Sequence, residues 1–126
     1  APSAVSWLLE LWAAIQFLDD AADGDKITRS DAEKASWSLL VGLHAHPFYT
    51  AHAATLSPIV ALQVLKWEAA NLAEAEGKAD ARSFMWRAGF YDVAAMVAHV
   101  CGCDPVEALR MYGETLSDYI LEVGNA

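Results

Sequence analysis

Four aspartates crowd into one short stretch of this chain, namely Asp19, Asp20, Asp23 and Asp25. Carboxylate oxygens are the ligands that hard divalent cations prefer, so this cluster is the first candidate for chemistry. Gly24 stands among the four, and glycine readily takes the positive φ of a tight turn. The pattern therefore predicts an acidic, solvated turn between two helices, on which a metal site is the alternative to test.

Two local resemblances to metal-binding motifs fall on this stretch. Asp19-Asp20-x-x-Asp23 resembles the magnesium-diphosphate motif of isoprenoid synthases, but those enzymes enclose a far larger helical cavity and use a second metal motif that this sequence lacks. Residues 23–28 resemble the middle of an EF-hand loop, which holds Ca²⁺ through oxygen ligands at fixed loop positions. The register does not fit, because Ala22 and Gly24 fall on ligand positions. We therefore expect no tight calcium binding here.

A second cluster combines an imidazole and two thiols in His99-x-Cys101-x-Cys103. These are the ligands that zinc prefers, and a Cys-x-Cys pair can also form a redox couple. Residues two apart do not share a helix face, and Gly102 separates the cysteines. The negative end of a helix dipole also disfavours a thiolate. We expect Cys101 to be buried and Cys103 to be incidental, with zinc and redox chemistry as alternatives.

Carboxylates also recur along two of the expected helices. All-α nucleotide pyrophosphatases hold Mg²⁺ with glutamates and an aspartate spaced E-x-x-E and E-x-x-D, and this chain resembles them in placing acidic stripes on helices. The spacing differs from that motif, and a charged stripe beside an apolar seam is typical of a solvated helix flank. A small Mg²⁺- or Mn²⁺-dependent hydrolase acting on nucleotides is therefore the alternative function. The acidic residues concerned are Glu68, Glu74, Glu76, Glu107, Glu114, Asp118 and Glu122.

Four polar residues in an otherwise apolar segment are the candidates for a ligand pocket: Arg87, Tyr91, Asp92 and His99. Asp92 and His99 are seven apart and share one helix face, while Arg87 and Tyr91 share the adjacent face. Such a set can shape a pocket between helices. The other interpretation is that Arg87 and Asp92 form a partly buried ion pair that orients the packing. The sequence predicts no catalytic residue, no favoured metal ligand set and no cofactor.

The elements that would position these groups are helices. Apolar residues at helical spacing predict helices over residues 3–22, 31–44, 58–76, 81–101 and 105–123, with a short helix or turn over 47–55. Ser30 with Glu33 reads as a capping box, and Ser57-Pro58 and Asp104-Pro105 as helix starts. Gly77 and Gly102 read as stops. We expect an all-α, compact single-domain bundle of residues 1–126, with about five long helices and one short one.

Composition narrows the class of protein further. The 126 residues are 56% hydrophobic and include five Trp, which is much apolar surface for so small a core to enclose. The formal net charge of −9 disfavours nucleic-acid and membrane-surface partners. The two cysteines are separated by a single residue, which excludes a disulfide framework. The apolar stretch 7–18 is too short to span a bilayer. We expect a cytoplasmic protein that does not bind a membrane.

The surplus of apolar surface indicates an interaction protein. The last helix carries a coiled-coil-like seam that, with the apolar first helix, predicts self-association. The leading hypothesis is a small non-enzymatic helical interaction or assembly protein, acting as a homodimer or with a protein partner, and Leu116→Asp tests it. The seam consists of Val106, Leu109, Gly113, Leu116, Ile120 and Val123.

Overall fold

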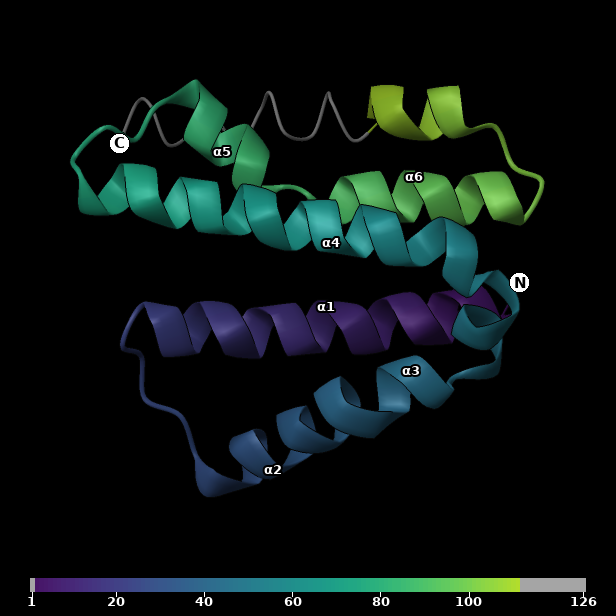
Figure 1. Cartoon of the computed structure of the whole chain (residues 1–126), viewed down its shortest axis with the longest axis horizontal. Coiled ribbons are helices and arrows are strands. Elements are labelled where there is room, and N and C mark those ends of the chain that lie inside the picture. The colour runs from purple at the N-terminus through teal and green to yellow at the C-terminus, as the bar shows by residue number, and fades with distance from the viewer. Residues whose placement is uncertain (1, 112–126) are drawn as a thin grey trace. The chain divides into compact units, whose positions relative to one another are not determined.

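A computed structural model describes residues 2–111 of the chain, and every regular element in that part is a helix (Figure 1). This confirms the all-α prediction. The chain divides into two compact units, Ala1–Ala53 and Ala54–Ala126, and each is described by itself. The prediction of one domain over residues 1–126 stays a prediction.

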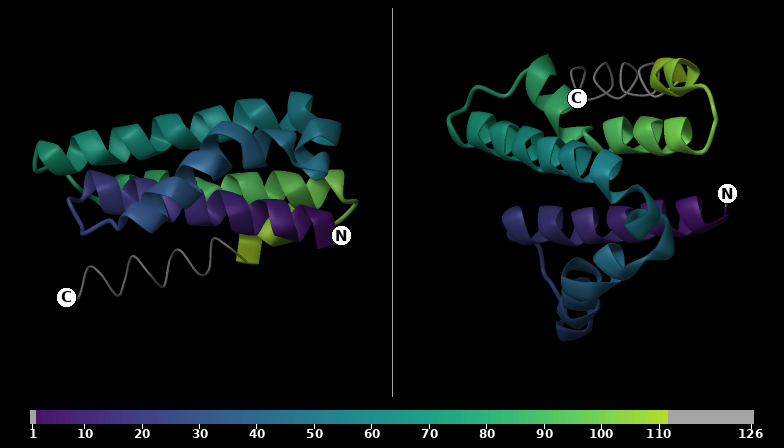
Figure 2. Two further views of the ribbon diagram at one scale, coloured as in Figure 1. Left: turned by 90° about the horizontal axis from the view of Figure 1, so that it is seen from below. Right: turned by 45° about the vertical axis from the view of Figure 1, so that its right-hand side comes forward.

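Helix α1, Pro2–Ala22, forms one side of the first unit and matches the expected bounds. Its buried residues are Ala4, Trp7, Leu11 and Ala14, which recur three or four apart and so form one stripe. These buried residues lie on one face of α1, whereas other large apolar residues of the helix are exposed. Both views in Figure 2 show α1 as one uninterrupted helix. Gly24, with φ +75°, follows its end as expected.

Helix α2, Arg29–Trp37, begins two residues before the expected helix start. Its N-cap is Thr28, whose hydroxyl accepts a hydrogen bond from the Asp31 amide at 3.1 Å. The Asp31 carboxylate in turn accepts from the Thr28 amide at 3.4 Å. The predicted capping box of Ser30 and Glu33 is therefore wrong in register, because Thr28 and Asp31 form the box with their own backbone amides two residues earlier.

The second expected helix is also interrupted. A π-helix, η1 (Ser38–Gly42), follows α2 directly, and a short helix, α3 (Leu43–Ala45), completes the segment. The Leu43 amide reaches back to the Ser38 carbonyl, which accommodates one extra residue per turn. A Cβ on Gly42 would meet the carboxylate of Glu10 on α1, so the glycine leaves room for that side chain.

Trp7 holds the centre of the first unit. It is 1% exposed, and its indole N–H donates to the Leu43 carbonyl at 3.2 Å. Its ring stacks on Tyr49 with centroids 5.6 Å apart and lies 6.1 Å from Phe48. One tryptophan thus ties α1 to the end of the interrupted segment and to the start of the next helix.

Helix α4, Pro47–Ala75, begins beside a histidine cap. The His46 Nδ1 accepts a hydrogen bond from the Phe48 amide at 3.2 Å, and its Nε2 lies 3.3 Å from the Ser6 hydroxyl. The interruption of α4 is at His52, where φ is −128° and ψ is 20°. Pro58 lies inside the helix, so the predicted start at Ser57-Pro58 is wrong.

Among residues 2–111, one helix is long and apolar enough to cross a membrane, and that helix is α4. Core helices of soluble proteins and signal sequences pass the same test, so this finding assigns no location.

In the second unit, the helix expected over 81–101 is broken into α5, Ala81–Arg87, and α6, Phe90–Val100. Asp80 caps α5, with its side chain accepting from two backbone amides. Ala88 departs from helical geometry, and Gly89 packs against α4: a Cβ there would lie 2.9 Å from Gln63 Cγ and 3.3 Å from Gln63 Cα. The break therefore allows close backbone approach that the helical pattern did not predict.

The stops at Gly77 and Gly102 are confirmed, with φ of +71° and +80°. Beyond the second stop, the Asp104 carboxylate accepts from the Val106 amide at 2.9 Å, and residues 105–111 are helical. The rest of the predicted seam lies outside the described residues: Gly113, Leu116, Ile120 and Val123, together with Glu114, Asp118 and Glu122.

Candidate functional site

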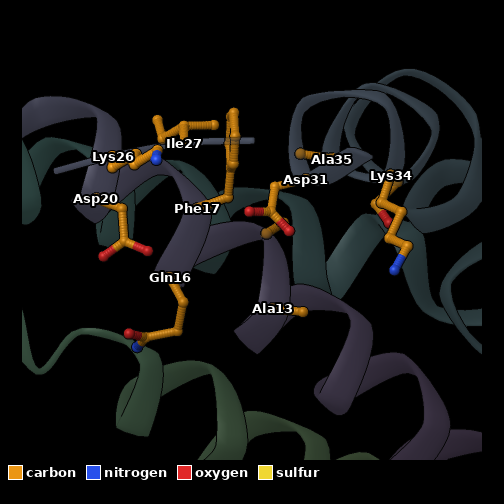
Figure 3. Close-up of a pocket in the computed structure, with 11 residues that line it drawn as sticks. Ala13, Gln16, Phe17, Asp20, Lys26, Ile27, Asp31, Lys34 and Ala35 are labelled. Atoms are coloured by element: carbon orange, nitrogen blue, oxygen red, sulfur yellow. The ribbon is translucent and has the colours of Figure 1, made fainter. Parts of the chain in front are cut away.

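The first unit contains a cavity of about 330 Å³ between α1, the loop after it and α2 (Figure 3). Helix α1 contributes one wall, the loop closes one end, and α2 with the start of η1 contributes the other wall. The lining residues are Ala13, Ala14, Gln16, Phe17, Asp20, Lys26, Ile27, Asp31, Lys34, Ala35 and Ser38.

Small residues create this hollow. Ala14 on α1 and Ala35 on α2 are both buried, and their methyl groups leave space that larger side chains would fill. Phe17 and Ile27 are half-buried and supply larger apolar surface beside them. The cavity therefore combines an apolar floor with an open, polar rim.

The rim carries two carboxylates and two ammonium groups. In Figure 3 the side chains of Asp20 and Asp31 lie on either side of Phe17, with Lys26 and Lys34 toward opposite ends of the view. Within residues 2–111, no hydrogen bond or ion pair joins Asp20, Lys26 or Lys34 to another side chain. The rim charges are therefore available to groups of either sign.

Asp20 is the one member of the aspartate cluster that lines the cavity, and Asp31 joins it from α2. Asp23 and Asp25 are exposed, and their backbone amides close the turn by donating to Asp19 and Asp20 carbonyls. Across the described part of the chain, no three His, Cys, Asp or Glu side chains group closely enough to hold a metal ion. The acidic, solvated turn is thus observed as predicted, and calcium binding remains to be measured.

A second feature of this unit is a shallow groove of about 450 Å³ on α2 and η1. We call it the α2–η1 groove, and its lining residues are Arg29, Ala32, Glu33, Ser36, Trp37, Leu40 and Val41. Trp37 is 65% exposed, Leu40 78% and Val41 38%, which is unusual for three large apolar side chains in so short a segment.

Helical spacing places these side chains outside. Ala35 and Leu43 are buried and lie eight positions apart, so they belong to the packed side of this segment. Trp37, Leu40 and Val41 are three and four apart and share the opposite face, which is exposed to solvent.

The four predicted pocket residues all belong to the second unit. The Arg87 guanidinium donates to Glu74 at 3.1 Å and to Asn71 at 2.9 Å, both on α4. Asp92 pairs with Lys66 of α4, with Lys66 Nζ 2.6 Å from Asp92 Oδ2. The alternative interpretation as an ion pair is therefore right in kind but wrong in partner, because each charge is paired with α4.

Tyr91 is half-buried beside Phe90, with ring centroids 6.3 Å apart, and His99 is exposed. Neither they nor Arg87 and Asp92 line the cavity or the α2–η1 groove. A pocket formed by these four residues stays a prediction.

The thiols also differ from expectation. Cys101 and Cys103 are both exposed and form no disulfide, so the expected burial of Cys101 is wrong. Cys101 directly follows the last residue of α6, and the chain turns at Gly102. The thiol is therefore at a helix end and not on the buried face of α6.

One carboxylate of the second unit, that of Asp80, has a lowered pKa. A side-chain hydrogen bond from Arg82 lowers the pKa of Asp80 below its usual 3.8, and the amides of Ser83 and Arg82 contribute in the same direction. The same pairing raises the pKa of Arg82. These shifts belong to the cap of α5 and not to a catalytic site.

No family model, no curated protein and no solved structure matches this chain. The cavity could not be predicted from the sequence, since Gln16, Lys26 and Lys34 have no motif spacing. The α2–η1 groove does have a sequence signal, because its residues from Arg29 to Val41 recur three and four apart and share one helix face.

Proposed function

We propose that this protein is a small non-enzymatic helical interaction protein that self-associates, and that the α2–η1 groove is the contact between copies. The observation that carries the proposal is the exposure of Trp37, Leu40 and Val41 side by side along one lined groove. Exposed apolar patches with a polar rim mark interaction surfaces in soluble proteins. Tryptophan is also the residue type most enriched at the energetic centre of such interfaces.

Charge favours a second copy as the occupant. The chain as a whole has a formal net charge of −9, so two copies repel each other over most of their surface. The groove is an exception, because its charged residues are one Arg29 and one Glu33, joined by a salt bridge of 3.3 Å. A locally neutral, apolar patch is where two acidic copies approach at least cost.

The size requirement is modest. An interface of ordinary size buries about 800 Å² on each partner, roughly a tenth of the 7902 Å² that this chain exposes. On a two-fold axis the same groove is used twice, so one patch serves both copies. Val5 and Leu9 of α1 are further exposed apolar residues of the same unit.

The test is the oligomeric state of matched variants. Sedimentation at about 100 μM protein should give a dimer for the wild type if the dissociation constant is about 1 μM. Leu40→Asp should give a monomer, because it places a charge in the centre of the apolar contact. Leu72→Asp is the control, since Leu72 is also exposed and lies on α4 of the second unit.

A wild-type monomer at that concentration would contradict self-association. A wild-type dimer that survives Leu40→Asp but is broken by Leu116→Asp would move the contact to the predicted terminal seam. The alternative function, a Mg²⁺- or Mn²⁺-dependent hydrolase, stays a prediction, since several of its carboxylates lie outside the described residues.

A further inference from the structure

We propose that Cys101 and Cys103 form a binding site for one soft monovalent metal ion, Cu(I), held between their two sulfur atoms. The site lies at the end of α6 in the second unit and shares no residue with the α2–η1 groove, so it goes beyond self-association. Its basis is a fixed turn that carries two exposed thiols next to each other in the chain.

Two backbone hydrogen bonds fix this turn. Cys101 caps α6 with φ −86° and ψ 0°, and Gly102 follows with φ +80°. The Gly102 amide donates to the His99 carbonyl at 3.1 Å, and the Cys103 amide donates to the Ala98 carbonyl at 2.8 Å. These two bonds form a Schellman motif. The backbone between the cysteines is therefore part of the helix end, and a ligand does not have to order it.

The covalent chain keeps the two thiols close together. One residue separates the cysteines, so their Cα atoms lie at most about 7 Å apart even in an extended chain, and the turn at Gly102 shortens this distance. Cysteines with Cα atoms about 4.4 to 6.8 Å apart can bond their sulfur atoms directly. An ion spans a wider gap, because it adds two metal–sulfur bonds of about 2.3 Å each. Both side chains are exposed and can turn toward one ion.

The number of ligands selects the ion. Thiolates are soft ligands and favour Cu(I) and Zn²⁺ among the common metals. A structural zinc site needs four ligands, but within residues 2–111 no three His, Cys, Asp or Glu side chains group closely enough to hold an ion. His99 is exposed and lies two residues before Cys101, so it does not share its helix face. Cu(I) is stable with two sulfur ligands in a line, which this pair supplies.

The charge balance favours a cation over thiol exchange. Binding releases the two thiol protons and forms two copper–sulfur bonds, and the copper stays Cu(I), so no electron is transferred. The negative end of α6 opposes a thiolate, but the bound ion offsets one of the two negative charges. Thiol–disulfide exchange has no such compensation, because its nucleophile is an unbound thiolate.

Competition for copper tests the site in the full chain, reduced with a phosphine and kept free of oxygen. The wild type should withdraw one Cu(I) per chain from its coloured bicinchoninate complex. Cys101→Ser and Cys103→Ser should each weaken this binding at least about hundredfold, since a single thiolate has lost the chelating partner. Both positions are exposed, so circular dichroism should be unchanged.

His99→Gln is the matched control and should bind Cu(I) as the wild type does. No withdrawal of copper by the wild type would overturn the proposal, as would tight binding retained in both serine variants. A loss in His99→Gln equal to that in the serine variants would also overturn it, because the site would then need the imidazole.

X-ray absorption at the copper edge tests the coordination number. It should show two sulfur neighbours and no nitrogen neighbour. A third protein ligand would contradict the two-coordinate site, and so would displacement of Cu(I) by an equal concentration of Zn²⁺.

The outcome is independent of the proposed dimer. Leu40→Asp changes the α2–η1 groove and leaves both cysteines in place, so it should bind Cu(I) as the wild type does. Sedimentation of this variant should give the same mass with and without Cu(I), because both sulfurs come from one chain. A copper-dependent dimer of Leu40→Asp would contradict a site within one chain.

Discussion

The two units each contain an interrupted helix, and the two interruptions have opposite results. In the first unit the chain passes from α2 to α3 through the π-turn Ser38–Gly42 and leaves Leu40 and Val41 exposed. In the second unit the chain breaks between α5 and α6 at Gly89, and the helix that follows buries Val93 and Val97. One interruption therefore lies beside exposed apolar residues, whereas the other lies in a packed core.

The neighbours of the two glycines also differ. Gly42 faces the end of the flexible Glu10 side chain, which can move, whereas Gly89 faces the backbone of Gln63 on α4. The second contact is a close approach of two helices and depends on the missing side chain. We infer that the break at Gly89 serves packing against α4, whereas the π-turn does not depend on a close backbone contact at Gly42.

The largest effect is expected at Trp7, which fixes the end of the interrupted segment in the first unit. Trp7→Ala should lower the free energy of unfolding by about 3 to 5 kcal/mol, because it removes a fully buried ring and its bond to the Leu43 carbonyl. Trp37→Ala is the matched control and should change stability by less than about 0.5 kcal/mol in the monomer. Urea denaturation at low protein concentration measures both, and equal losses would contradict the contrast between core and surface.

Gly89→Ala should have the next largest effect on the free energy of unfolding. Its new Cβ would lie 3.3 Å from Gln63 Cα, so the backbones of α4 and α6 must separate. We expect a loss of about 1 to 3 kcal/mol in the free energy of unfolding, the usual cost of overpacking. A neutral or stabilising result by urea denaturation would show that the break does not depend on close packing.

Gly42→Ala should cost less than about 1 kcal/mol, because the Glu10 side chain can swing aside and alanine is the better helix former. In the Glu10→Ala background, Gly42→Ala should become neutral or stabilising. A double-mutant cycle by urea denaturation measures this coupling. A loss at Gly42 as large as that at Gly89 would remove the distinction between the two interruptions.

The smallest effect concerns the cap of α5. The pKa of Asp80 is lowered by the Arg82 hydrogen bond, so the contribution of Asp80 to stability is present above its unfolded value of 3.8 and is lost as the pH falls further. Asp80→Asn keeps a capping side chain but does not titrate. Thermal unfolding from about pH 5 to about pH 2 should therefore show a slightly smaller loss in Asp80→Asn than in the wild type. An identical acid response in both would contradict a lowered pKa at this cap.

Much of the fold could be predicted from the sequence because the signals are local. The apolar spacing of α1, the cap at Asp80 and the glycine stops at Gly77 and Gly102 all depend on neighbours along the chain. The wrong assignments lack such a signal. The interruption of α4 is at His52, whereas Pro58 lies inside the helix. Gly89 has the same apolar helical surroundings as its neighbours, and its role depends on the tertiary contact with Gln63.

The candidate site was harder to predict for the same reason. The aspartate cluster drew attention to Asp20, but its partner carboxylate Asp31 belongs to a helix that began in a different register. Trp67 and Trp86 are half-buried, whereas Trp7 is fully buried. Periodicity identifies which residues share a face but not which face a neighbouring helix covers.

The histidine that caps α4 has a further consequence for coordination chemistry. The Nδ1 lone pair of His46 accepts a hydrogen bond from the Phe48 amide. In the neutral ring the proton is therefore on Nε2, which lies beside the Ser6 hydroxyl. A transition metal needs a free imidazole lone pair. His46 offers one to a metal after the first turn of α4 has opened, so its affinity for metals would report on the fraying of that helix.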